Sequence, residues 1–204
     1  MTQFLFSIDR ISMWTGKAFA WCIMLMTVGV SYEVFVRYVL GAPTSWAFDL
    51  SYIMYGALFM LGGAYTLSRG GHVRGDVLYR LLPVRVQATV ELVLYILFFF
   101  PAMIAMVFAG ADYASDSWRY GELSLMSRAN IPIFPFKTII PVAGALLFLQ
   151  GIAESIRCVI CLRDGEWPAR LHDVEEMETM LQHQHEDESE VLGEISSLAK
   201  GDGR

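Results

Sequence analysis

The sequence predicts an all-α membrane protein with four transmembrane helices. Four long apolar stretches lie at about residues 18–40, 46–67, 87–109 and 138–160. Each reaches the roughly 20 residues that a helix needs to cross about 30 Å of hydrocarbon. The chain is 55% hydrophobic and has a mean hydropathy of +0.45, which is too apolar for an ordinary soluble domain of 204 residues.

The residues before the first span, 1–17, have an amphipathic pattern. Charged Asp9, Arg10 and Lys17 are set against a group of apolar residues, namely Phe4, Leu5, Ile8, Ile11 and Trp14. We therefore treat residues 1–17 as an amphipathic segment that precedes the first span. The apolar run that follows is too long for the core of a signal peptide, so we expect the first span to be retained.

A short connection, residues 41–45, joins spans one and two and predicts an antiparallel hairpin. Trp46 at its end is typical of an aromatic anchor at the membrane interface. Arg37 lies one turn after Glu33, and Asp49 begins span two. Ionisable groups at membrane depth are costly and usually paired, so we expect Glu33 or Asp49 to neutralise Arg37.

The second connection begins with paired glycines that favour a helix end. From Val73 to Leu82 the apolar residues share one helical face, which predicts a short amphipathic helix lying on the membrane surface. A plain, positively charged loop is the alternative, and the pattern does not choose between them.

The third connection, residues 110–137, mixes aromatic and charged residues, so it should not be embedded in hydrocarbon. We expect a second surface-lying helix over residues 110–128, on the outer side. Pro132 and Pro135 should end it, and Pro141 falls in the opening turns of span four, where missing amide donors cost least.

Small residues in two spans favour close helix packing. They are Gly62 and Gly63 in span two and Gly144 and Gly151 in span four. Gly144 and Gly151 are seven residues apart and therefore share a face. The sequence leaves open whether that face meets this chain or a partner.

Charge is distributed unevenly along the chain. Residues 164–204 hold twelve acidic and three basic residues, whereas residues 1–163 hold nine acidic and twelve basic ones. We therefore divide the chain into an N-terminal segment (1–17), a membrane domain (18–163) and an acidic tail (164–204). The tail is expected to form short amphipathic helices or to be disordered. No basic stripe outside the spans indicates a nucleic-acid partner.

The basic residues also predict an orientation. Nine lie on the side of the termini (Arg10, Lys17, Arg69, Arg74, Arg80, Arg85, Arg157, Arg163 and Arg170), and four on the other (Arg37, Arg119, Arg128 and Lys137). By the positive-inside rule, both termini and the acidic tail should be cytoplasmic.

The sequence indicates no catalytic, metal or substrate site. Cys158 and Cys161 have the C-x-x-C spacing of redox motifs, so a four-helix membrane thiol redox protein is the alternative function. No second cysteine pair completes a relay or a four-ligand zinc site. His72 is the only histidine before residue 172, which argues against a haem held between spans. No row of carboxylates crosses the membrane, which argues against an independent channel or transporter.

Several motifs together resemble a known family. They are, in order, Arg37, Pro43, Trp46 and Asp49, then Gly62-Gly63-Ala64-Tyr65, then Arg69-Gly-Gly-His72-Val-Arg74-Gly-Asp76, and finally Ile131-Pro132 and Pro141 before the last span. The series is similar to the small membrane subunit (DctQ-like) of tripartite ATP-independent periplasmic (TRAP) transporters, over about residues 10–160. The family often has paired acidic residues soon after the tryptophan, whereas this chain has Phe48-Asp49.

The resemblance implies a non-catalytic subunit of the bacterial inner membrane, without a cofactor of its own. A large membrane subunit, bound 1:1, would carry Na⁺ and substrate, and a periplasmic binding protein would deliver the substrate, commonly an organic acid anion. The small subunit would scaffold the large one. We expect the segment with Arg69, His72, Arg74 and Asp76 to hold the cytoplasmic turn at the lipid headgroups. Trp46 and residues 110–128 would lie where the binding protein could touch.

Overall fold

The computed structural model describes residues 2–70, 82–168 and 170–171. It divides into two units, Met1–Pro168 and Ala169–Arg204, and all the helices discussed below belong to the first. Four helical segments are long and apolar enough to cross a membrane, and the described residues form no β-strand. The predicted all-α membrane fold is therefore confirmed. The expected surface helix over residues 73–82 and the acidic tail lie outside the described residues.

Helix α1 runs without interruption from Thr2 to Val39. The N-terminal segment is thus the first part of one long helix, and its buried face differs from the expected one. The buried stripe contains Leu5, Ile8, Asp9 and Ser12, whereas Trp14 is exposed. Spacings of three and four residues place the stripe on one helical face. The apolar pattern misidentified this face because the polar partners of Asp9 and Ser12 come from the other end of the chain.

Helix α2 (Ala47–Ser68) pairs with α1 as the expected antiparallel hairpin. Gly41, just after the end of α1, has a φ of 63°, a left-handed conformation that glycine adopts at little cost. Gly16 of α1 faces the ring of Tyr65, which would clash with any side chain at this position. The two helices therefore approach closely at the end that carries the N-terminus.

The third membrane helix is longer than the sequence predicted. It comprises α4 (Val84–Leu94), one π-helical turn η1 (Tyr95–Phe99) and α5 (Phe100–Tyr120). Pro101 lies in the first turn of α5, with one residue, Phe100, between it and the end of the π turn. Proline lacks an amide donor and its ring crowds the preceding turn, so the widened turn accommodates it.

The prediction of a separate surface helix over residues 110–128 was wrong. Residues 110–120 continue α5 in the same helix, and Gly121, with a φ of 58°, ends it. Gly110, Ala114 and Ser117 are buried and form a stripe of small residues on one face. This stripe lets α5 keep packing against the start of the last helix, which the sequence alone did not show.

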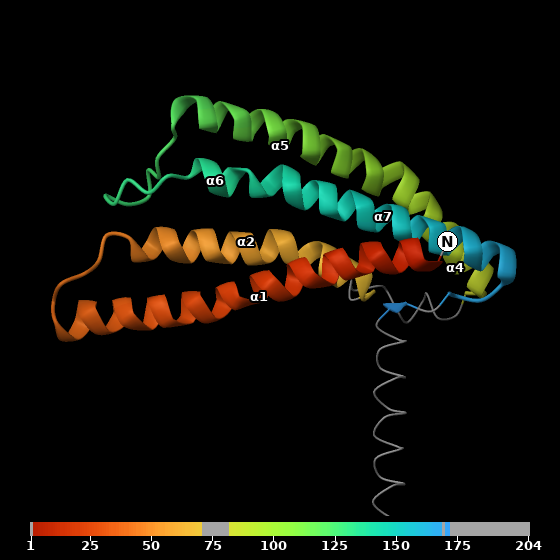
Figure 1. Ribbon diagram of the computed structural model, residues 1–204, viewed down its shortest axis with the longest axis horizontal. Helices are drawn as coiled ribbons and strands as arrows, with labels where there is room; N and C mark the ends of the chain where they lie inside the picture. Colours follow the sequence, from red (N-terminus) through yellow and green to blue (C-terminus); the bar gives the residue numbers. More distant parts are fainter. Residues whose placement is uncertain (1, 71–81, 169, 172–204) are drawn as a thin grey trace, which may run out of the picture. The chain divides into compact units, whose positions relative to one another are not determined.

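Residues 121–133 connect α5 to the short helix α6 (Phe134–Lys137) and then to α7 (Ile139–Asp164). We name them the outer loop because they lie at the end of the helices that is away from the N-terminus (Figure 1). A single antiparallel bridge joins Leu123 to Pro132. Pro141 lies in the opening turns of α7, as expected. Pro132 and Pro135 do not end the preceding helix as predicted, because α5 already ends at Gly121, and Pro135 lies in the first turn of α6.

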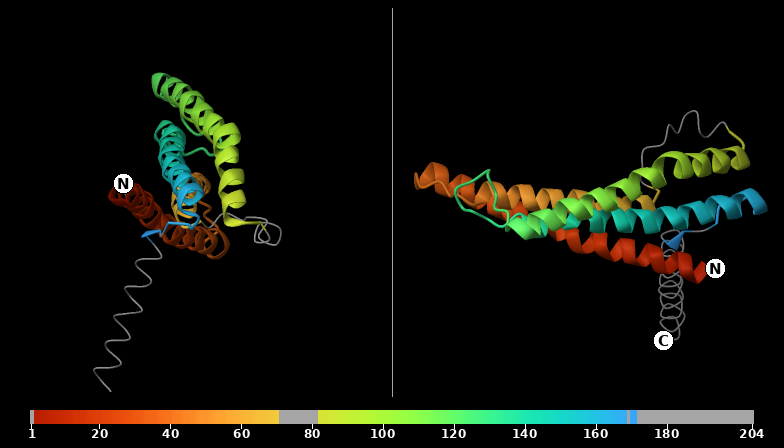
Figure 2. Two further views of the ribbon diagram at one scale, coloured as in Figure 1. Left: turned by 90° about the vertical axis from the view of Figure 1, so that its right-hand side faces the viewer. Right: turned by 90° about the horizontal axis from the view of Figure 1, so that it is seen from above.

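Helix α7 is central to the unit. It lies between the α1–α2 hairpin and the α4–α5 helix, and it contacts both (Figures 1 and 2). Gly144 faces Val107 of α5, and Gly151 faces the ring of Phe99 in the π turn. The glycine face of α7 therefore meets this chain, which resolves the alternative that the sequence left open.

Candidate functional site

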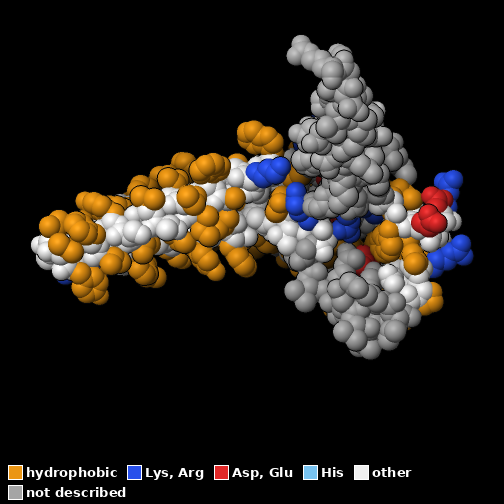
Figure 3. Space-filling view, turned by 90° about the horizontal axis from the view of Figure 1, so that it is seen from below, with side chains coloured by type: hydrophobic (Ala, Val, Ile, Leu, Met, Phe, Trp, Pro, Cys, Tyr) orange, Lys and Arg blue, Asp and Glu red, His pale blue; other side chains and the backbone are white. Residues whose placement is uncertain are grey.

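The described helices present their ionisable side chains at two ends. The N-terminal end holds the start of α1 and the ends of α2 and α7. The hairpin end holds the end of α1, the start of α2, the outer loop and α6 (Figure 1). Between these ends no Asp, Glu, Lys or Arg occurs at residues 18–32, 50–68, 92–111 or 138–153. Figure 3 shows hydrophobic side chains along the elongated part of the molecule.

A buried polar network joins α1 to α7 at the N-terminal end. We name it the α1–α7 cluster, and it consists of Asp9, Ser12, Gln150, Glu154 and Arg157. Ser12 donates to Gln150 Oε1 at 2.8 Å, and Gln150 Nε2 donates to Asp9 Oδ1 at 2.9 Å. Arg157 Nη1 donates to Glu154 Oε1 at 2.5 Å, and Nη2 donates to Asp9 Oδ2. One guanidinium thus holds two carboxylates from different helices.

The cluster is almost fully enclosed by protein. The side chains of Arg157, Asp9 and Glu154 are 1%, 4% and 2% exposed. Charges this deeply buried are tolerated only when they are paired and hydrogen-bonded. Arg157 Nε remains buried without a hydrogen-bond partner among the described residues. The cluster therefore fixes the position of α1 against α7.

Two cysteines lie beside this cluster on α7. Cys158 and Cys161 are both fully buried, and Cys158 Sγ donates to Glu91 Oε2 of α4 at 3.8 Å. No group of three or more metal-ligating side chains occurs in the described part of the chain. The two thiols contribute to the contact between α7 and α4.

At the hairpin end, Glu33 is the centre of a second network, the hairpin clamp. Arg37 donates to Glu33 Oε1 through Nη2 at 2.6 Å and through Nε at 3.0 Å. Thr44 donates to Glu33 Oε2 through its hydroxyl and, at 3.0 Å, through its backbone N–H. The structure therefore pairs Arg37 with Glu33 and not with Asp49. Trp46 stacks on Tyr32 with 6.2 Å between ring centroids.

Asp49 holds the outer loop in a third network, the loop clamp. Its carboxylate accepts hydrogen bonds from Ser124 Oγ at 2.6 Å and from Ser127 Oγ. In turn, Ser124 Oγ accepts a hydrogen bond from the backbone N–H of Met126, and Ser127 Oγ accepts one from that of Ala129, each at 3.2 Å. Asp49 is only 1% exposed, so these serines satisfy a buried charge. No local pattern pairs Asp49 with residues that are 75 and 78 positions away.

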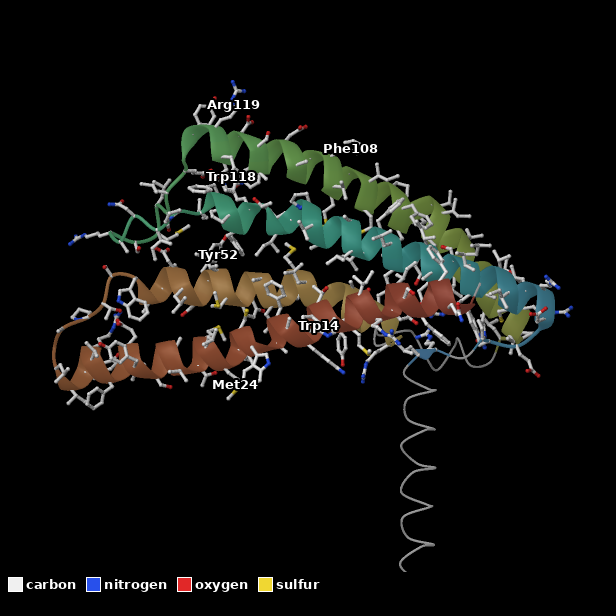
Figure 4. All side chains as sticks on the ribbon, in the orientation of Figure 1. Trp14, Met24, Tyr52, Phe108, Trp118 and Arg119 are labelled. Carbon is white, nitrogen blue, oxygen red and sulfur yellow. The ribbon has the colours of Figure 1, made fainter. Side chains whose placement is uncertain are left out.

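Glu122 ties the outer loop to α5 and α6. Its Oε2 accepts a hydrogen bond from Ser117 at 2.7 Å and forms an ion pair with Lys137. The hydrogen bond from Lys137 and, to a smaller extent, the one from Ser117 lower the pKa of Glu122 below its ordinary value. Nearby, Trp118 points toward α6 and donates to Thr138 Oγ1 at 2.9 Å, while Arg119 points away from the bundle (Figure 4).

The remaining residues selected from the sequence are dispersed. Arg69 is exposed, with its guanidinium 5.0 Å from the centre of the Tyr65 ring. A Cβ added to Gly63 would lie 3.6 Å from Leu147 of α7, whereas one added to Gly62 would meet nothing within 4 Å. His72, Arg74 and Asp76 lie outside the described residues.

The α1–α7 cluster was not predicted from the sequence. The amphipathic pattern of residues 1–17 set Asp9 on the polar face, opposite the apolar residues. Gln150 was the available signal, because an amide within a long apolar run needs a buried partner.

Four membrane-spanning helices, with charged side chains paired at the two ends, define an integral membrane protein of the helical-bundle class. A family model for the DctQ component of tripartite ATP-independent periplasmic transporters matches residues 26–161. The chain therefore belongs to the DctQ family. It is the small permease component of a TRAP transporter, a protein of the inner membrane. No curated protein matches the chain in a sequence comparison.

Proposed function

We propose that this chain is a non-catalytic scaffold for the large membrane subunit of a Na⁺-coupled TRAP transporter that imports an organic acid anion. The observation that carries the proposal is the layer without charged residues across all four helices. An ion or anion crossing the membrane needs polar groups at midplane. Substrate and Na⁺ would therefore bind the large subunit, after a periplasmic binding protein delivers the substrate.

The polar networks support a static role. The α1–α7 cluster and the hairpin clamp are closed, with each carboxylate held by a cation or a hydroxyl of the same chain. Buried networks of this kind favour one arrangement of the helices over others. A rigid subunit of this type suits the non-moving part of a transporter.

Helix α1 offers a surface for the large subunit. Beyond Gly16 its main contact is with α2, and large apolar residues at seven-residue spacing are exposed along it, namely Trp14, Trp21, Val28 and Phe35. Seven-residue spacing places these side chains along one seam, as in helices that pack in pairs. In Figure 4, Trp14 and Met24 lie along this helix.

The test is co-purification of a tagged chain from native membranes with the large subunit, together with uptake of the substrate. Trp21→Ala should lower the yield of the complex. Phe108→Ala on α5 is the matched control, because Phe108 is 70% exposed and Trp21 is 69% exposed. A chain that purifies without a large membrane protein, or that transports alone, would overturn the proposal.

A further inference from the structure

A groove lies on the surface of α7, beside Phe100 of α5. It has a volume of about 380 Å³, and its walls are apolar except for Ser155; the lining residues are Phe100, Ile152, Ser155, Ile156, Val159 and Ile160. Ile156 and Ile160 also pack against Leu5, Ile8 and Ala153, so the floor of the groove is continuous with the core between α1 and α7. The volume is in the range of small-molecule sites.

The groove runs along α7 toward the C-terminal end of this helix. Ile152, Ile156, Val159 and Arg163 follow at spacings of four, three and four, and therefore share one face of α7. The lining residues from Ile152 to Ile160 cover roughly 12 Å at about 1.5 Å per residue, and Arg163 lies about one turn further along the same face. A segment of an acyl chain that fills the groove would thus end about one helical turn from Arg163.

Charges of both signs surround that end. The Arg163 side chain is 86% exposed, with Asp164 Oδ1 at 3.5 Å from its Nε. Arg85 of α4 approaches the same helix end, since a Cβ on Gly165 would lie 3.7 Å from its Nη2. Glu166 follows and is exposed. Charged side chains of both signs are visible at this end of the molecule (Figure 3).

We propose that this groove binds one phospholipid with an ethanolamine headgroup, its acyl chain along α7 and its phosphate beside Arg163 and Arg85. The two carboxylates nearby would accept the ammonium group. Among the described residues named here, Arg163 and Arg85 balance Asp164 and Glu166, so these four side chains attract an anionic headgroup less than two arginines alone would. A choline headgroup would lack the N–H donors that Asp164 and Glu166 can accept.

The proposal is tested on the full chain, purified in detergent and stripped of lipid. Phosphatidylethanolamine, phosphatidylcholine or phosphatidylglycerol is then added back, and retained lipid is counted by native mass spectrometry. We expect one retained phosphatidylethanolamine per chain, in preference to the other two lipids. Equal retention of all three would show unselective annular lipid and overturn the proposal.

Two variants locate the site. Val159→Trp should fill the groove and abolish the selective retention. Val142→Trp should leave it unchanged, because Val142 lies on the same helix with a similar exposure of 47%, against 53% for Val159. Arg163→Gln, at an exposed position that folding tolerates, should weaken binding about fivefold, the loss of one basic contact to a headgroup. Equal behaviour of the two tryptophan variants, or unchanged binding by Arg163→Gln, would refute the assignment.

Discussion

Replacing Arg157 by leucine should strongly destabilise the protein. Arg157 is the only cation among the described residues that form the α1–α7 cluster, and its removal would break the buried ion pairs to Asp9 and Glu154 together. Breaking a buried ion pair by removing one partner costs about 3–5 kcal/mol. For a chain of this size, each kcal/mol lowers the melting temperature by about 2–4 °C, so we expect a decrease of roughly 6–20 °C.

The assay is thermal unfolding of the purified chain in detergent, followed by circular dichroism. Arg163→Leu is the control, because this arginine is 86% exposed and its replacement should change stability by less than about 0.5 kcal/mol. Replacing Asp9, Glu154 and Arg157 together by leucine should restore much of the loss, since an apolar replacement leaves no unpaired charge. If Arg157→Leu melts within about 2 °C of Arg163→Leu, the cluster does not hold α1 to α7.

Three further outcomes are expected. The pKa of Glu122 is lowered, so its contact with Lys137 stabilises the fold fully above the ordinary glutamate pKa of about 4.3, and this stabilisation is lost as the pH falls through the lowered pKa. Acidification should therefore change Trp fluorescence at the outer loop, and Glu122→Gln should remove this response. Asp49→Ala should free the outer loop, so limited proteolysis should cleave it sooner than in the unmodified chain, and equal cleavage would argue against the clamp. Gly151→Leu should clash with the ring of Phe99 and destabilise the protein by about 1–3 kcal/mol, whereas Gly62→Ala, in open space, should not destabilise it. Similar melting temperatures of the two variants would contradict this packing.

The membrane helices were predictable because hydrocarbon imposes one simple rule on the sequence. A helix that crosses it must be apolar for about 20 residues, and composition alone reveals such stretches. Their ends were predicted less well. Residues 110–120 contain charged and aromatic side chains, yet they continue α5 because Gly110 and Ala114 allow close packing against α7. That packing depends on a segment that comes about 30 residues later in the chain.

The polar networks were predictable only within single helices. Glu33 with Arg37, and Glu154 with Arg157, lie one turn apart, and helical geometry alone brings them together. Asp9 and Asp49 find their partners more than 70 residues away. No local pattern encodes such a distance, so Asp9 was placed on the wrong face.

The contact between Asp9 and Arg157 also constrains how the chain is assembled in the membrane. The two residues are 148 positions apart, so Asp9 enters the bilayer region with the first helix and meets its countercharge only when the last helix has been inserted. An aspartate at membrane depth costs up to about 3 kcal/mol, which favours an early α1 that remains displaced toward the surface. Arg157 arrives already paired with Glu154 on its own helix, and this pairing reduces the charge that α7 carries into the lipid. Insertion of α7 is therefore the step that draws the start of α1 into its final position.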